Sequence, residues 1–229
     1  MVVKHLCKLI FHTVLLAIAL ILYFTNQDFG AGFLLIIWLS LAVPMMFRIF
    51  PNRCIALGAR KHFACTYNPA PVAKAEIKGR GFHKGAVFCA LGWLVVTAAM
   101  LLALFRVDML TAQTTIIIAL AYAVVDIVFV LFFCPFRALF MRNHCCVTCR
   151  IHNWDYFMKC APLILFPSIY TVSLVILSVV VVLRWEISLW RNPHFFMRET
   201  NQNLRCSACE DKLCQLRIRK LEQRDPDIP

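Results

Sequence analysis

Five long apolar stretches, separated by polar segments, dominate the pattern of hydrophobic and polar positions along the chain. Each is close to the roughly 20 residues that a helix needs to cross a bilayer. A helix also satisfies its own backbone hydrogen bonds, as lipid requires. The pattern therefore predicts an all-α membrane protein with about five transmembrane helices in residues 1–183, followed by a polar, cysteine-containing tail at 184–229. The predicted helices cover residues 6–24, 33–50, 86–105, 116–134 and 162–183.

The overall composition supports the membrane class. Hydrophobic residues make up 61% of the chain and charged residues 16%, against roughly 45–50% and about 25% in soluble domains. A water-soluble fold of 229 residues could not cover so much apolar surface with the polar surface that remains.

The net charge of +12 comes from 24 basic and 12 acidic side chains. In a soluble protein this excess would suggest nucleic-acid binding. Here the basic residues lie between and after the apolar stretches, where anionic lipid headgroups and the positive-inside rule account for them. The predicted partner is therefore the lipid bilayer, and nucleic-acid binding is not favoured.

The basic residues also predict an orientation. Segment 48–85 carries eight of them and turn 25–32 carries none, so the N-terminus is expected on the cytoplasmic side of the cell (inner) membrane. Segment 137–159, with four, falls on the same side. Five full crossings would then put the tail's nine basic residues on the opposite side. Four crossings plus a re-entrant segment, broken by Pro162 and Pro167, would avoid this. We favour five crossings and leave the side of the tail open.

Two cysteine groups near helix ends are the candidate metal site. Each contains a C-x-x-C pair, whose two-residue spacer lets both thiolates face one ion. Zinc and an iron–sulfur cluster are the cofactors that such thiolates hold. Disulfides and unligated thiols are the alternatives. The candidate ligands are Cys146, Cys149, Cys206, Cys209, Cys214, His144 and His152.

A shared site between these two groups faces two obstacles. About 57 residues separate Cys149 from Cys206, whereas roughly 15–20 are usual between zinc knuckles. Five full crossings would also place the two pairs on opposite faces of the membrane. In that case the tail cysteines would be better explained as a disulfide pair with one remaining thiol.

Asp126 and His12 are polar residues inside predicted spanning helices. Counting about 1.5 Å per residue from the helix ends places them about 12 Å and about 9 Å deep, so they could meet if their helices pack together. A charge at this depth usually has a partner and often a function. A proton relay or ion site is one interpretation, and we favour the other, an interhelical hydrogen bond.

Five stretches resemble uncharacterised multi-spanning membrane proteins of bacteria: 150–156, 184–186, 192–194, 199–201 and 205–214. The resemblance covers about the last third of the chain and carries no activity with it. P-loop, nucleophile-elbow and zincin motifs do not occur in the sequence.

Three functions remain as hypotheses. The leading one is a membrane protein whose cysteine-bearing segments bind a metal or cluster, acting as a redox or structural subunit of a larger membrane complex. The second is a transporter or ion-conducting protein that uses Asp126. The third is a thiol-redox membrane enzyme that uses Cys146 and Cys149.

Overall fold

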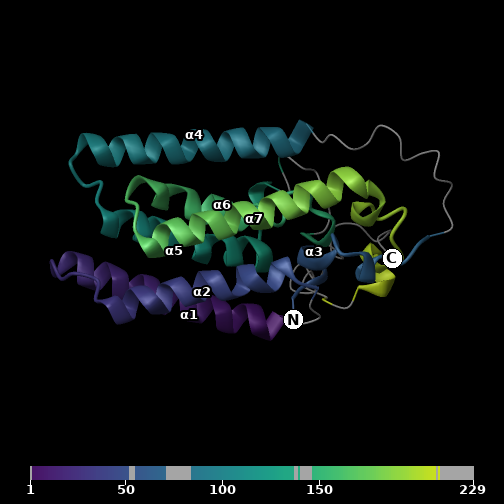
Figure 1. Ribbon diagram of the computed structural model, residues 1–229, viewed down its shortest axis with the longest axis horizontal. Helices are drawn as coiled ribbons and strands as arrows, with labels where there is room; N and C mark the ends of the chain where they lie inside the picture. Colours follow the sequence, from purple (N-terminus) through teal and green to yellow (C-terminus); the bar gives the residue numbers. More distant parts are fainter. Residues whose placement is uncertain are drawn as a thin grey trace, which may run out of the picture.

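Five long apolar helices form an elongated bundle in the computed structural model (Figure 1). The structure describes residues 2–51, 55–70, 84–136, 139, 146–209 and 211. All five helices are long and apolar enough to cross a membrane, which confirms the predicted all-α membrane class. They are α1 (Val2–Phe24), α2 (Ala31–Ile49), α4 (Lys84–Arg106), α5 (Ala112–Leu131) and α7 (Ile169–Arg191).

The last long helix begins and ends later than predicted. A helix over 162–183 was expected, but α7 covers Ile169–Arg191. Ser168 and Thr171 form a capping box at its start, which satisfies backbone N–H groups of the first turn. The residues before it form two short helices, α6 (Asp155–Cys160) and the 3₁₀ helix η5 (Ala161–Leu165). Both short helices pack against α5 and α7, inside the bundle.

The packing directions show that the tail returns to the end where the chain begins. α7 packs beside α2 in the same direction. Trp38 contacts Ser173 in the first half of both helices, and Ser188 in the last turn of α7 contacts His62 of the polar segment that follows α2. The sequence left the side of the tail open, and in the structure α7 ends at the end of the bundle where α1 begins. The α6–η5 segment carries the chain back before α7 begins, a passage too short and too charged to be predicted as a spanning helix.

The hydrophobic core lies between α1, α2, α5, α6, η5 and α7. α5 is central, because 44% of its apolar stretch is buried inside the protein. α4 is peripheral, because only 11% of its apolar stretch is buried. Figure 1 shows α4 at the edge of the bundle. A hydrogen bond of 2.8 Å joins Thr97 of α4 to Tyr122 of α5.

Three polar segments, 55–70, 146–154 and 193–209, cover one end of the bundle, and we call them the polar cap. The cap contains α3 (Leu57–Arg60) and the 3₁₀ helices η1 (Ala64–Thr66), η4 (Cys146–Thr148), η6 (Pro193–Phe196), η7 (Gln202–Leu204) and η8 (Cys206–Ala208). Pro69 and Asn201 form an antiparallel bridge. Phe195 and Phe196 pack on Trp185 of α7. The described part of the tail therefore folds against the rest of the chain.

Candidate functional site

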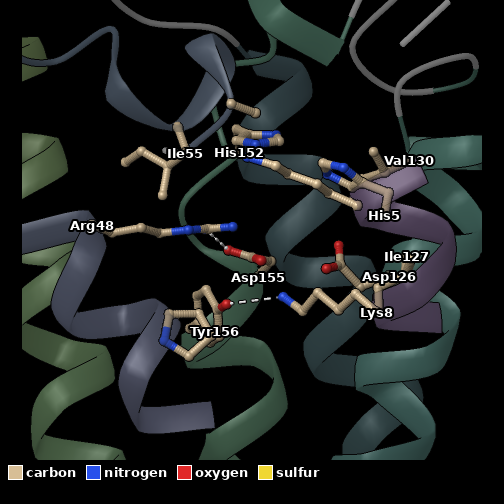
Figure 2. Close-up of a pocket in the computed structure, with 14 residues that line it drawn as sticks. His5, Lys8, Arg48, Ile55, Asp126, Ile127, Val130, His152, Asp155 and Tyr156 are labelled. Atoms are coloured by element: carbon tan, nitrogen blue, oxygen red, sulfur yellow. Dashed lines mark hydrogen bonds and ion pairs between the residues drawn. The ribbon is translucent and has the colours of Figure 1, made fainter. Parts of the chain in front are cut away.

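A cavity of about 160 Å³ lies where the bundle meets the polar cap (Figure 2). α1, α2, α5, the start of α6 and the α3 region all contribute to its wall. Eight of its fourteen lining residues are ionisable, although the cavity lies within the end turns of apolar helices. The ionisable lining residues are Lys4, His5, Lys8, Arg48, Asp126, His152, Asp155 and Tyr156.

A network of ion pairs crosses one side of the cavity. Arg48 Nη1 lies 2.5 Å from a carboxylate oxygen of Asp155, and Lys159 Nζ lies 3.0 Å from the other. Lys159 also lies 2.7 Å from Asp126. The Lys159 side chain is 3% exposed, and an unpaired charge at such a site would be strongly unfavourable. The two acids of the cavity are thus already paired with cations.

These pairs fix the charge states of the network. Asp155 lies between the cations of Arg48 and Lys159, and Lys159 lies between the carboxylates of Asp126 and Asp155. Each buried charge is thus next to charges of the opposite sign, which favour its ionised form. Asp155 and Lys159 therefore both stay charged around neutral pH.

Three basic side chains contact Tyr156. Its side chain is buried, and Lys8 Nζ donates a hydrogen bond of 3.3 Å to its hydroxyl. Arg48 Cζ and Lys159 Nζ each lie 4.4 Å from the ring centroid, within cation–π range. Figure 2 shows Lys8 and Arg48 reaching toward Asp155 and Tyr156 from opposite sides.

The cations of the cavity outnumber its carboxylates. Four basic side chains, Lys4, Lys8, Arg48 and Lys159, line the cavity or pair with its lining, against Asp126 and Asp155. His152 adds no charge at neutral pH, because burial, reinforced by Arg48, lowers its pKa to about 3. The site therefore carries an excess of two positive charges, and an anion is the chemistry it can bind.

α3 forms the wall between the cavity and the cysteine segment 146–149. Ala59 lines the cavity, and its carbonyl oxygen accepts a hydrogen bond of 3.2 Å from Asn153. Asn153 in turn accepts one of 3.0 Å from Arg48. A Cβ at Gly58 would lie 3.3 Å from Val147 Cα. The backbone of α3 is thus held directly against segment 146–153.

The predicted intramembrane pair is replaced by other partners. α1 and α5 do pack together, but Asp126 forms its ion pair with Lys159. His12 is buried, and its Nδ1 lies 2.9 Å from the Lys8 carbonyl oxygen of its own helix. The favoured interpretation was an interhelical hydrogen bond between Asp126 and His12, whereas the structure pairs Asp126 with Lys159 of α6. A transport role for Asp126 stays a prediction.

The described cysteines of the two groups, Cys146, Cys149 and Cys209, lie in the polar cap. Cys146 and Cys149 flank η4, where Lys61 Nζ donates hydrogen bonds to the carbonyl oxygens of Val147 (2.8 Å) and Cys149 (2.7 Å). Cys209 packs against the small cluster that contains Val147. Burial raises the pKa of the Cys149 thiol to about 11, although Lys61 opposes this.

Not all predicted metal ligands can be placed. His152 lines the charged cavity. His144, Cys214 and the side chain of Cys206 lie outside the described residues. Within the residues that the structure describes, no three His, Cys, Asp or Glu side chains converge on one point.

The cavity residues Lys8, Arg48, Asp155 and Lys159 were not predicted as site residues. Each lies at the edge of an apolar stretch, where a charged residue is normally explained by the lipid headgroups. One signal was available: Asp155 and Lys159 stand four residues apart, the spacing of a helical ion pair, directly before an apolar run.

Fold and site together define an integral membrane protein of the all-α class, with a cation-rich cavity at one end of its bundle. No protein-family model, curated protein or solved structure matches the chain. The resemblance of the last third of the chain to bacterial membrane proteins therefore stays a prediction.

Proposed function

We propose that this membrane protein binds an anionic ligand in the cavity between the bundle and the polar cap. One observation carries the proposal: both carboxylates of the cavity are already paired with Arg48 and Lys159, while Lys4 and Lys8 add two further positive charges. A hollow with an excess of one sign of charge raises the local concentration of ions of the other sign. A cavity of about 160 Å³ also far exceeds the roughly 10–15 Å³ that one water needs.

We further infer that the polar cap faces the cytoplasm of the cell. The described parts of the three basic segments, 55–70, 146–154 and 193–209, lie together at the end of the bundle that carries the cap. The turns at the other end carry one basic residue at most. The positive-inside rule then holds for every segment.

Lipid retention by the purified full-length protein tests anion binding. Native mass spectrometry would compare dioctanoyl phosphatidylglycerol, which is anionic, with the zwitterionic dioctanoyl phosphatidylcholine. We expect the wild type to retain phosphatidylglycerol preferentially. Ala56→Leu places extra volume in the cavity wall and should remove this preference. Ala64→Leu, an exposed position of the same cap, is the matched control and should keep it. Equal retention of both lipids by the wild type would contradict the proposal.

The second candidate function is thiolate metal binding at the polar cap. The observation that favours it is that the tail packs on segment 146–149, with Cys209 against the cluster around Val147. This removes the objection that the two C-x-x-C groups lie on opposite faces. In this proposal Cys146, Cys149, Cys206 and Cys209 hold zinc or an iron–sulfur cluster. Such a centre would make the chain a structural or redox subunit of a membrane complex.

Metal analysis of protein purified without oxygen tests the second candidate. We expect zinc or iron close to one equivalent, lost in Cys146→Ser/Cys149→Ser and in Cys206→Ser/Cys209→Ser. Cys7→Ser changes an exposed cysteine of α1 and should retain the metal. A wild-type protein without zinc or iron would contradict this candidate and leave the anion site unaffected.

A further inference from the structure

We propose that the anion is the phosphomonoester headgroup of a membrane lipid, with its phosphate in the cavity and its acyl chains along the bilayer side of α1. This inference rests on the proposed anion-binding function and names the class of ligand. It uses three features of the cavity: its excess charge, its hydrogen-bond donors and its place on α1.

The charge of the site matches a dianion. Lys4, Lys8, Arg48 and Lys159 face the two carboxylates of Asp126 and Asp155, which leaves two positive charges uncompensated. A phosphomonoester carries about −1.5 to −2 at pH 7, whereas a phosphodiester headgroup such as phosphatidylglycerol carries a single negative charge. The monoester neutralises the site most closely.

The donors of the site suit phosphate oxygens. An ammonium group has three N–H donors, and a hydrogen bond to the Tyr156 hydroxyl occupies one donor of Lys8. Lys4 lies one helical turn before Lys8 on α1, so both ammonium groups can reach one ligand. The terminal oxygens of a phosphate can accept charge-assisted hydrogen bonds from several such donors at once. A carboxylate has fewer oxygens and accepts fewer of them.

The position of the site on α1 points to a lipid source. Lys4 and Lys8 lie in the first two turns of a spanning helix, the depth at which headgroups lie. Positions 4, 11 and 18 recur every seven residues and so share one side of the helix. Phe11 and Ile18 on that side are 46% and 40% exposed. An apolar stripe thus continues from the cationic site into the bilayer, where acyl chains can pack against it.

The experiment titrates detergent-purified full-length protein with three probes and reads binding by native mass spectrometry. The probes are dioctanoyl phosphatidic acid, dioctanoyl phosphatidylglycerol and inorganic phosphate. We expect phosphatidic acid to bind about tenfold more tightly than phosphatidylglycerol. Inorganic phosphate should compete only at far higher concentration, because it lacks the acyl chains.

Two charge-matched double variants locate the binding. Lys4→Gln/Lys8→Gln removes the excess charge of the cavity and should abolish the preference for phosphatidic acid. Arg191→Gln/Arg198→Gln removes the same charge from exposed positions at the same end of the molecule and should keep it. Lys8→Arg preserves the charge and should retain most of the wild-type affinity for phosphatidic acid. A thermal melt of each variant verifies that it is folded.

Each contrary result removes a different part of the proposal. Equal affinity for the two lipids, with both dependent on Lys4 and Lys8, overturns the monoester assignment but leaves anion binding in the cavity. Inorganic phosphate that competes as well as phosphatidic acid overturns the lipid source. Equal losses in the two double variants overturn the location of the site, and with it the proposed function.

Discussion

Trp38 of α2 donates an indole hydrogen bond to the hydroxyl of Ser173 of α7, with 2.8 Å between Nε1 and Oγ. Ser173 lies in the second turn of α7 and Trp38 at the start of the third turn of α2. Contacts between the two helices continue toward their ends at the cap, so α2 and α7 run side by side in the same direction. α5 ends at the cap, where Asp126 meets Lys159 of α6. The chain must therefore return along the bundle before α7 begins, and the α6–η5 segment is the passage. This return decides which polar segments can meet.

The first prediction is that the tail and segment 55–70 are reached from the same side of the membrane. In a background without other cysteines, Cys65 and Ser207→Cys should react with an impermeant maleimide from one side. Asp28→Cys, in the turn after α1, should react from the other. All three positions are exposed. Labelling of intact cells and of inverted vesicles checks this, and joint labelling of positions 28 and 207 would contradict the parallel packing of α2 and α7.

The long helices were predictable because each is an apolar run of bilayer length, a property of one segment alone. The α6–η5 return was not, because it contains the charges of Asp155 and Lys159 and a proline, Pro162. Its one indirect signal was the nine basic residues of the tail, which five full crossings would have placed on the wrong side.

The cavity was not predictable for a different reason. Lys8, Arg48 and Asp126 come from three separate helices. Lys8 and Arg48 are each explained by a place near a helix end, and only Asp126 was predicted as a candidate site residue. Only the packing of α1 on α5, and of α6 between α5 and α7, brings them to one hollow. Periodicity within a segment carries no information about such contacts.

The second prediction concerns the ion pairs of Lys159. Lys159→Met leaves the carboxylates of Asp126 and Asp155 close together without their shared cation. Removing one partner of a buried pair typically costs about 3–5 kcal/mol, and the partial exposure of Asp126, at 29%, places the expected loss toward the lower figure. A thermal melt in detergent should show a lower Tm for this variant.

The double variant Lys159→Met/Asp126→Leu is the matched comparison for that loss. It removes the cation together with one of its two carboxylates, while Asp155 keeps Arg48. Replacing a whole buried pair by apolar side chains is often neutral, so most of the lost stability should return. A double variant that melts at or below the temperature of Lys159→Met would show that the pair does not act as a unit.

The third prediction is a loss of stability in mild acid, to which His62 contributes. His62 is buried beside Trp185, and burial lowers its pKa from 6.5 to about 4. Between these two values the unfolded chain binds the proton more tightly than the folded one, so stability falls as the pH drops from about 6.5 to about 4. At pH 5 the contribution is about 2 kcal/mol.

Thermal melts at pH 7 and pH 5 check this contribution. His62→Gln retains a side-chain donor for the Ala59 carbonyl oxygen, which the imidazole contacts at 3.0 Å, but it does not titrate. The Tm of both proteins should fall between pH 7 and pH 5. The fall should be smaller for His62→Gln, and the difference between the two falls should be about 4–8 °C for a chain of this size. Parallel losses in both proteins would exclude a contribution of His62.

The last prediction compares two glycines that differ only in their surroundings. A methyl group at Gly58 of α3 would lie 3.3 Å from Val147 Cα and 3.5 Å from His152 Nε2. Because the first contact is with backbone, Gly58→Ala must push α3 away from segment 146–153, at an expected loss of about 1–3 kcal/mol. At Gly92 of α4, nothing lies within 4 Å of the same position, and alanine is the better helix former by about 0.5–1 kcal/mol. Gly92→Ala should therefore melt at no lower temperature than the wild type, and Gly58→Ala should melt at a lower temperature.

The Gly58 variant should also bind dioctanoyl phosphatidylglycerol more weakly, because Ala56 and Ala59 of the displaced wall line the cavity. If Gly58→Ala kept both the melting temperature and the lipid affinity of the wild type, the close packing of α3 on the cysteine segment would not be what shapes the site.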